Sequence, residues 1–315
     1  MSSLRRFVGL DLGGTNIKSA VIEIVPGSIP VVLYNGSEPT EADQGPDAVA
    51  ERIVEIGAAL TEKFDQIDAV GVTVPGMFNE RTGRVAKLPN LPGDWVGMPL
   101  RGKVAAGIGL PTAMINDAKA FTLAESTVGA AKGATDVLAV VLGTGIGGGL
   151  MVNGKLIFGH NGQAGEIGHQ VVIPDGPLCG CGGRGCLESI AATGPLLRRT
   201  GKATVKEVFD AARAGEPAAV EAVNDAITYI GLAIANIITM LLPSRVVVGG
   251  GIANAGDQLF VPLREQVARF ANIVNRSWYE VVPAALGSDG GAIGAALWAD
   301  LSPTKESAPR DSARP

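Results

Sequence analysis

Two stretches of the chain share one pattern: an apolar run, a glycine-rich turn that contains Gly-Thr, and a second apolar run. The first is FVGLDLGGTNIKSAVIEI, from Phe7, and the second is VLAVVLGTGIGGGLMV, from Val137. Runs rich in Val and Ile on both sides of a short turn indicate β-hairpins, and the β-rich residues after each turn argue against a Walker A helix. The repeat therefore predicts two related halves, each with a hairpin.

Both hairpins are candidates for binding phosphate through backbone N–H groups, although a plain glycine-rich hairpin is the alternative for each. A third cluster, Gly249, Gly250 and Gly251, follows the apolar run SRVVV and suits close approach of a nucleotide. The chain has 44 glycines, well above the usual share of about 7%. The candidate nucleotide and phosphate contacts in the hairpins are Asp11, Gly13, Gly14, Thr15, Asn16, Lys18, Gly143, Thr144 and Gly145.

Between the hairpins, apolar periodicity and turn residues predict an alternation of helices and strands. We expect helices near 46–63 and 98–107, buried strands over 67–76 and 111–117, and no regular structure in the Pro- and Gly-rich segment 81–95. Carboxyl ends of strands meet at one edge of an α/β sheet, so Asp11, Gly76 and Asp117 are expected there together. Asn116 and Asp117 precede a helix, and the alternative for Asp117 is a helix N-cap.

Residues 164–188 contain all three cysteines and one of the two histidines. Three thiolates and one imidazole form a complete tetrahedral set for Zn²⁺, which predicts a structural rather than a catalytic ion. Buried or redox cysteines are the alternative, but an odd number and the Cys-x-Cys spacing do not favour disulfides. The predicted ligands are His169, Cys179, Cys181 and Cys186. Glu166 and Glu188 flank them as candidate acceptors for ligand hydroxyl groups, against the alternative of solvated surface charges.

Composition narrows the possible function classes. A length of 315 residues allows two domains, and a net charge of −5 without a basic run argues against nucleic-acid binding. The N-terminus does not resemble a signal peptide, and reduced cysteines favour the cytoplasm. The uncharged segment 226–244 approaches the length of a membrane span, but it continues a charged helical stretch and predicts a core helix. The last residues, 302–315, predict a disordered tail.

Six motifs follow one another along the chain: DLGGTNIK, NLPGDW, NDA, LGTGIGGGLMVNGKLIFGHNGQAGEIGH, CGCGGRGCLE and VVVGGG. In these motifs and their order, the chain resembles the ROK family of sugar kinases over nearly its whole length. The resemblance implies a two-lobed α/β fold of the ribonuclease-H-like, actin/hexokinase type. The small lobe is expected to comprise residues 1–116 with a returning helix near 291–301, and the large lobe residues 117–290.

The resemblance also implies a function: phosphoryl transfer from ATP with Mg²⁺ to a hexose, with glucose as the default. Asp117 resembles the general base, Asp11 the acid near Mg²⁺, and the 143–145 loop the phosphate contacts. The residues that resemble the family's sugar ligands are Asn90, Asn116, Glu166, His169 and Glu188, and we also expect Gly76 at the sugar. Family precedent suggests a homodimer or homotetramer.

Two departures from the family motifs concern the sugar: Lys119-Ala-Phe121 replaces Asn-Ala-Ala, and Asp94 enlarges the sugar loop. Both are expected near the hexose pocket, so mannose, fructose, allose, an N-acetylhexosamine or a polyol are alternatives to glucose. A sugar-sensing repressor is disfavoured because the first hairpin begins too early for a preceding helix-turn-helix. A non-catalytic sugar-binding protein is disfavoured by Asp11 and Asp117. Polyphosphate is the alternative phosphoryl donor. The glycines Gly249–Gly251 favour a nucleotide, and therefore ATP, over polyphosphate.

Overall fold

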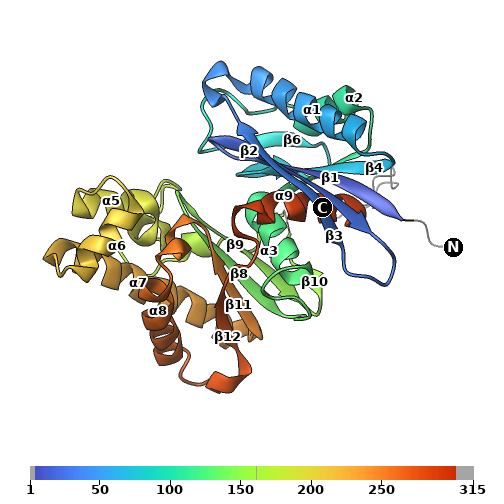
Figure 1. The fold of residues 1–315 in the computed structure, drawn as a ribbon. Coiled ribbons are helices and arrows are strands. Elements are labelled where there is room, and N and C mark those ends of the chain that lie inside the picture. Colours follow the sequence, from blue (N-terminus) through green and yellow to red (C-terminus); the bar gives the residue numbers. More distant parts are fainter. Residues whose placement is uncertain (1–3, 161, 303–315) are drawn as a thin grey trace, which may run out of the picture. The chain divides into compact units, whose positions relative to one another are not determined.

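The computed structural model of the chain describes residues 4–160 and 162–302 (Figure 1). The chain forms two compact units: a first unit, up to Ala120 and again from Gly291 onward, and a second unit, from Phe121 to Gly290. The first boundary between the units lies inside a helix, between Ala120 and Phe121. The expected boundary was between Asn116 and Asp117. Apart from Ser302, the tail expected to be disordered lies outside the described residues.

The first unit is built on a five-stranded sheet in the order β3-β2-β1-β4-β7. Its strands are β1 (Arg5–Leu12), β2 (Asn16–Ile24), β3 (Val31–Pro39), β4 (Ile67–Val74) and β7 (Thr112–Asn116). Strands β1, β2 and β3 are antiparallel neighbours, whereas β4 and β7 run parallel to β1. A small antiparallel pair, β5 (Met77–Asn79) and β6 (Arg84–Lys87), corrects the expectation that 81–95 has no regular structure, because β6 pairs with residues before that segment.

Helices of the first unit are η1 (Ala42–Gln44), α1 (Pro46–Lys63), α2 (Leu100–Ile108), the start of α3 (Asp117–Thr127) and α9 (Gly290–Leu301). Helix α9 packs on the sheet where two glycines are neighbours in β1 and β4. A Cβ added at Gly9 would lie 1.9 Å from the Ala292 carbonyl oxygen, and one at Gly71 would lie 1.8 Å from the Ala295 carbonyl oxygen. The absence of side chains at these positions therefore lets a helix from the end of the chain complete the first unit.

The second unit contains a sheet with the same succession, β10-β9-β8-β11-β12. Its strands are β8 (Val137–Leu142), β9 (Ile146–Val152), β10 (Lys155–Leu156), β11 (Arg245–Gly249) and β12 (Glu280–Pro283). As in the first sheet, an antiparallel hairpin is followed by two strands parallel to its first strand. The repeated sequence pattern thus corresponds to a repeated topology.

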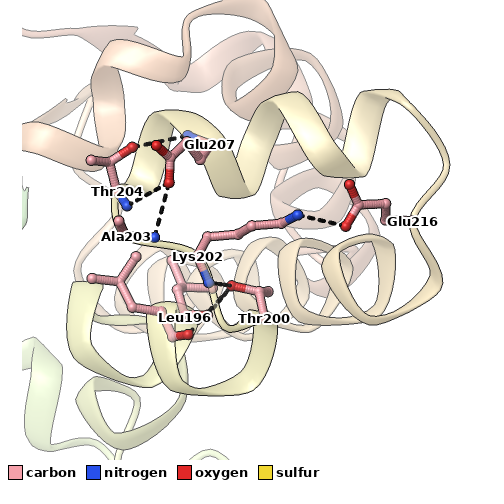
Figure 2. A network of polar contacts seen from close by, with 8 residues as sticks. Leu196, Thr200, Lys202, Ala203, Thr204, Glu207 and Glu216 are labelled. Atoms are coloured by element: carbon pink, nitrogen blue, oxygen red, sulfur yellow. Dashed lines mark hydrogen bonds and ion pairs between the residues drawn. The ribbon is translucent and has the colours of Figure 1, made fainter.

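Helices of the second unit are the remainder of α3, α4 (Glu188–Ala191), α5 (Thr193–Thr200), α6 (Val205–Arg213), α7 (Pro217–Leu241) and α8 (Asp257–Phe270), with 3-10 turns η2 (Ile167–His169), η3 (Gly251–Ala255), η4 (Arg276–Trp278) and η5 (Gly287–Asp289). Helix α6 begins with a capping box. Thr204 Oγ1 accepts from the Glu207 N–H, and the Glu207 carboxylate accepts from the Thr204 N–H, both at 3.2 Å (Figure 2). Lys202 and Glu216 form an ion pair at 2.7 Å beside this cap.

Helix α7 contains the apolar segment singled out in the sequence. By length and composition alone it could cross a membrane, and half of its most apolar window is buried inside the protein. Its buried face, including Ala222, Ile230 and Ile234, belongs to the hydrophobic core of the second unit. One face of α7 therefore packs as the sequence predicts for a core helix.

Candidate active site and metal centre

In the first unit, Asp11 lies at the end of β1 opposite Lys18 on β2. Its partly buried carboxylate accepts a hydrogen bond through Oδ1 from the hydroxyl of Thr73 on β4. Burial raises the pKa of the Asp11 carboxyl, and the Thr73 hydrogen bond and the Lys18 charge oppose this rise. Thr73 was not predicted as a site residue, because it becomes a neighbour of Asp11 only when β1 and β4 pair.

The turn between β1 and β2 is closed by a hydrogen bond from the Gly13 N–H to the Asn16 carbonyl oxygen at 3.1 Å. Thr40, fully buried, braces this turn from a distant part of the chain. Its hydroxyl donates to the Gly13 carbonyl oxygen at 2.7 Å, and its N–H donates to the Thr15 carbonyl oxygen at 2.9 Å. Gly14 and Thr15 form the exposed tip, where backbone groups can meet a ligand.

At the junction of β7 and α3, Asn116 and Asp117 make different hydrogen bonds. Asn116 Oδ1 accepts from the Lys119 N–H at 3.2 Å, so Asn116 is the N-cap of α3. Its Nδ2 also donates to the Gly76 carbonyl oxygen at 3.4 Å. Asp117 is the first helical residue, half-buried, and its Oδ1 accepts from the Ala118 N–H at 2.8 Å. Asn116 is therefore the N-cap of α3, and Asp117 also bonds an N–H of the first turn.

The loop expected to bind sugar lies beside the first hairpin. Asn90 is exposed in this loop, and a Cβ added at Gly14 would lie 3.4 Å from its carbonyl oxygen. The first unit therefore brings two predicted elements together, the sugar loop and the phosphate hairpin.

In the second unit, the turn of the β8–β9 hairpin is held from α4 and α5. The Gly143 N–H donates to the Gly145 carbonyl oxygen, and the Thr193 N–H donates to the Gly143 carbonyl oxygen, both at 2.9 Å. Glu188 Oε2 accepts from the Ile146 N–H at 2.9 Å. Glu188 therefore supports the hairpin that carries Thr144 at its exposed tip, a role that the sequence did not reveal.

Four potential metal ligands gather next to this hairpin. Their ligand atoms lie within 4.8 Å of one another, and they belong to His169, Cys179, Cys181 and Cys186. His169 Nδ1 is 3.7 Å from Cys179 Sγ, and the sulfur atoms of Cys181 and Cys186 are also 3.7 Å apart. Two ligand atoms that each lie about 2.3 Å from one ion, at tetrahedral angles, are about 3.7 Å from each other. The donor set and its spacing fit Zn²⁺.

The free thiols differ in acidity. Burial, reinforced by the neighbouring thiols, raises the pKa of Cys186 to about 12, and burial also raises the pKa of Cys179. The Gly183 N–H, 3.4 Å from Cys181 Sγ, lowers the pKa of Cys181. A metal ion must displace protons from the two buried thiols, so metal affinity should increase with pH.

Glu166 immediately precedes the short turn η2, and His169 is the last residue of that turn. Both residues are exposed, and the His169 N–H donates to the Glu166 carbonyl oxygen at 3.1 Å. Because His169 Nδ1 faces the cysteines, its Nε2 is the ring nitrogen available to another group.

The third glycine cluster is more closely packed than its sequence suggests. A Cβ added at Gly250 would lie 2.3 Å from the Leu142 carbonyl oxygen, and one at Gly249 would lie 2.6 Å from the ring of Phe121. Only Gly251, among these three, has open space beside it. Phe121, which was expected near the hexose pocket, has its ring buried in the second unit against the glycine cluster expected to bind the nucleotide.

Sequence reasoning also missed Glu125, a fully buried carboxylate on α3. It accepts hydrogen bonds from the N–H groups of Ala130 at 2.7 Å, Ala285 at 3.2 Å and Leu286 at 2.9 Å. Glu125 therefore attaches the segment before α9 to α3 within the second unit.

Comparisons with known proteins agree with this architecture. The model of the ROK family matches residues 7–301. The glucokinase of Thermotoga maritima is 36% identical over 312 residues, or 92% of this chain and 96% of that protein. The structure of a ROK hexokinase from Thermus thermophilus has 36% identity and a TM-score of 0.84, covering 94% of this chain and 98% of that chain.

The structure of a ROK family glucokinase from Streptomyces griseus, in complex with glucose and AMPPNP, has 31% identity and a TM-score of 0.77. The structural match covers 95% of this chain and 100% of the Streptomyces griseus chain. These similarities confirm the predicted ribonuclease-H-like, actin/hexokinase-type fold class.

Proposed function

The chain belongs to the ROK family, and from this premise we propose that it is a glucokinase-type sugar kinase that uses ATP to convert glucose to glucose 6-phosphate. The observation that carries the proposal is the geometry at the start of α3. Asn116 supplies the N-cap, and the half-buried carboxylate of Asp117, whose Oδ1 accepts from the Ala118 N–H, is the proposed base.

Phosphoryl transfer depends mainly on positioning and electrostatic stabilisation. Asp117 accepts the proton of the attacking sugar hydroxyl, and Asp11 faces the Mg²⁺ that accompanies the nucleotide. The tips of the two hairpins offer backbone N–H groups to the phosphates, and Gly251 has room for the nucleotide. Sugar hydroxyls bind to Asn90, Asn116, Glu166, Glu188 and the Nε2 atom of His169.

The Cys/His cluster holds a structural Zn²⁺ through His169, Cys179, Cys181 and Cys186, as its ligand spacing supports. Four protein ligands complete a tetrahedral set, so the ion fixes this loop and takes no part in the chemistry. Through His169 and the adjoining Glu166 it orders the sugar-binding side chains.

The enzyme operates in the cytoplasm at the entry of glucose into glycolysis, as a homodimer or homotetramer. Initial rates with a panel of hexoses, N-acetylhexosamines and polyols, each with ATP and with polyphosphate, test the proposed sugar and the proposed phosphoryl donor. A higher kcat/KM for any sugar other than glucose, or for polyphosphate, would reassign the substrate and leave the kinase chemistry in place.

Asp117→Asn tests the proposed base. Asn keeps the shape of the side chain and cannot take up the proton, so kcat should fall by about a hundred- to ten-thousandfold while glucose binding persists. Turnover and calorimetric glucose affinity are measured on the same preparation. Asp257→Asn is the matched control, since Asp257 is the first residue of α8 and exposed. An Asp117→Asn enzyme within about threefold of the wild-type kcat would reject Asp117 as the base.

Metal analysis tests the proposed zinc. Protein purified without chelators should contain about one Zn²⁺ per chain, because four potential ligand atoms lie within 4.8 Å of one another. Cys186→Ser should lower the metal content and the melting temperature together, since binding energy of a structural ion contributes to folding. Less than half an equivalent of zinc, with three freely titrating thiols, would contradict the assignment.

A further inference from the structure

Thr73 is a fully buried polar residue on β4, directly opposite Asp11 in the parallel pairing of β1 and β4. Its hydroxyl makes two hydrogen bonds at the end of this ladder. It accepts from the Leu12 N–H at 3.2 Å, and it donates to Asp11 Oδ1. A hydroxyl has a single proton, so the bond from Leu12 directs that proton toward Asp11.

The other side of the Asp11 carboxylate faces the first turn of α9. A Cβ added at Gly291 would lie 2.4 Å from Asp11 Oδ2 and 2.8 Å from Oδ1. The carboxylate is therefore enclosed between a hydroxyl that holds Oδ1 and a backbone that has no side chain. These two contacts limit rotation of the carboxylate about its last bond.

We propose that Thr73 is a positioning residue that fixes the orientation of the Asp11 carboxylate toward the Mg²⁺–nucleotide complex. The proposal rests on the proposed function, in which Asp11 faces that metal ion. Valine at position 73 would leave two groups without partners at once, the Leu12 N–H and Asp11 Oδ1. Serine would preserve both hydrogen bonds.

The test compares Thr73→Val with Thr73→Ser. Calorimetric titration of Mg²⁺–AMPPNP and the Mg²⁺ dependence of kcat are measured for each. We expect Thr73→Val to weaken Mg²⁺–AMPPNP binding by about ten- to a hundredfold, as for loss of a hydrogen bond to a charged group. Glucose affinity should stay within about threefold of the wild type, and Thr73→Ser should recover nucleotide binding.

Thr112→Val is the matched control. Thr112 is half-buried at the opposite end of the same sheet, where its hydroxyl donates to the Leu110 carbonyl oxygen at 3.2 Å. This variant should change neither affinity. If Thr73→Val does not fold, Thr73→Ala removes the same hydroxyl with less crowding and replaces it in the test.

Asp11→Asn separates failure of this inference from failure of the proposed function. If Asp11→Asn leaves Mg²⁺–AMPPNP binding intact, Asp11 does not face the metal ion, and the inference fails together with the proposed role of Asp11; failure of the proposed function would instead appear as a wild-type protein that phosphorylates no sugar. If Asp11→Asn weakens this binding and the Thr73 variants do not, only the positioning role is overturned. A Thr73→Val enzyme that loses glucose and nucleotide affinity equally, without recovery in Thr73→Ser, would show a structural role and also overturn the inference.

Discussion

At the scale of single residues, Glu188 connects two features that the sequence treated separately. Its Oε2 atom accepts from the Ile146 N–H of the second hairpin, and its Oε1 atom lies 3.9 Å from Cys179 Sγ. A Cβ added at Gly145 would lie 2.6 Å from Oε2. From the sequence, we expected Glu188 only to hold sugar hydroxyls, so its loss would affect the KM for sugar far more than the KM for ATP. The contact with Ile146 implies an effect on both.

Two substitutions at Glu188 separate these effects. Glu188→Ala removes the acceptor of the Ile146 N–H and should raise the KM values for glucose and ATP, each by about ten- to a hundredfold. Glu188→Gln keeps an oxygen for Ile146, so it should raise the KM for glucose and leave the KM for ATP within about threefold. Initial-rate kinetics with each substrate varied in turn measure both constants.

Glu166→Ala is the control for Glu188, because Glu166 is exposed and its proposed role involves the sugar alone. Equal increases of the two KM values in Glu188→Gln would place the carboxylate outside the sugar site. An unchanged KM for ATP in Glu188→Ala would show that the hairpin does not need this contact.

At the scale of elements, the site of the first unit depends on how closely α9 approaches the sheet. Gly9 and Gly71 admit the backbone of α9, and the Trp298 indole N–H donates to the Met114 carbonyl oxygen at 2.9 Å. The same helix places Gly291 against Asp11. A helix from the far end of the sequence therefore determines the shape of the site around Asp11.

Gly71→Ala tests this packing. The added methyl group would overlap the Ala295 carbonyl oxygen, so we expect a loss of about 1–3 kcal/mol in the free energy of unfolding. The control is Gly102→Ala in the exposed part of α2, where a Cβ meets nothing within 4 Å. That variant should gain about 0.5–1 kcal/mol. Urea unfolding measures both, and a Gly71→Ala protein as stable as the wild type would contradict the tight contact with α9.

At the scale of the whole molecule, each unit has its own hydrophobic core. The core of the first unit extends from Val8 to Met114, and the core of the second from Leu138 to Val281. The second unit also contains the metal cluster, and the first contains Asp117. Separate cores allow the two units to unfold separately.

Scanning calorimetry tests this independence. The unliganded protein should give a calorimetric enthalpy larger than the van't Hoff enthalpy, because two units do not unfold in one two-state step. Gly71→Ala should lower the transition temperature of the first unit alone, and removal of the proposed zinc should lower the transition temperature of the second. A single transition with equal enthalpies, shifted as a whole by both changes, would mean that the units unfold as one.

The sequence by itself determined the features that depend on neighbouring residues. Alternating apolar runs and Gly-Thr turns predicted both hairpins and the repeated topology, since a strand's period and a turn's chemistry are local. The cysteines and histidine within 169–186 predicted a site for one metal ion, and the structure brings these four potential ligands together. The Asn-Asp pair at the start of α3 matched a family motif that made Asp117 the candidate base, with helix capping as the alternative.

Tertiary structure decided the contacts between segments that are distant in the sequence. Thr73, Thr40 and Glu125 are ordinary residues in the sequence, and they acquire roles because strand pairing and helix packing bring Asp11, Gly13 and the 285–286 segment to them. Phe121, which the sequence placed near the sugar loop residues, has its ring in a core cluster of the second unit for the same reason. A buried hydroxyl or carboxylate leaves no local periodicity or spacing in the sequence, because its partner is chosen only when the sheets and helices pack.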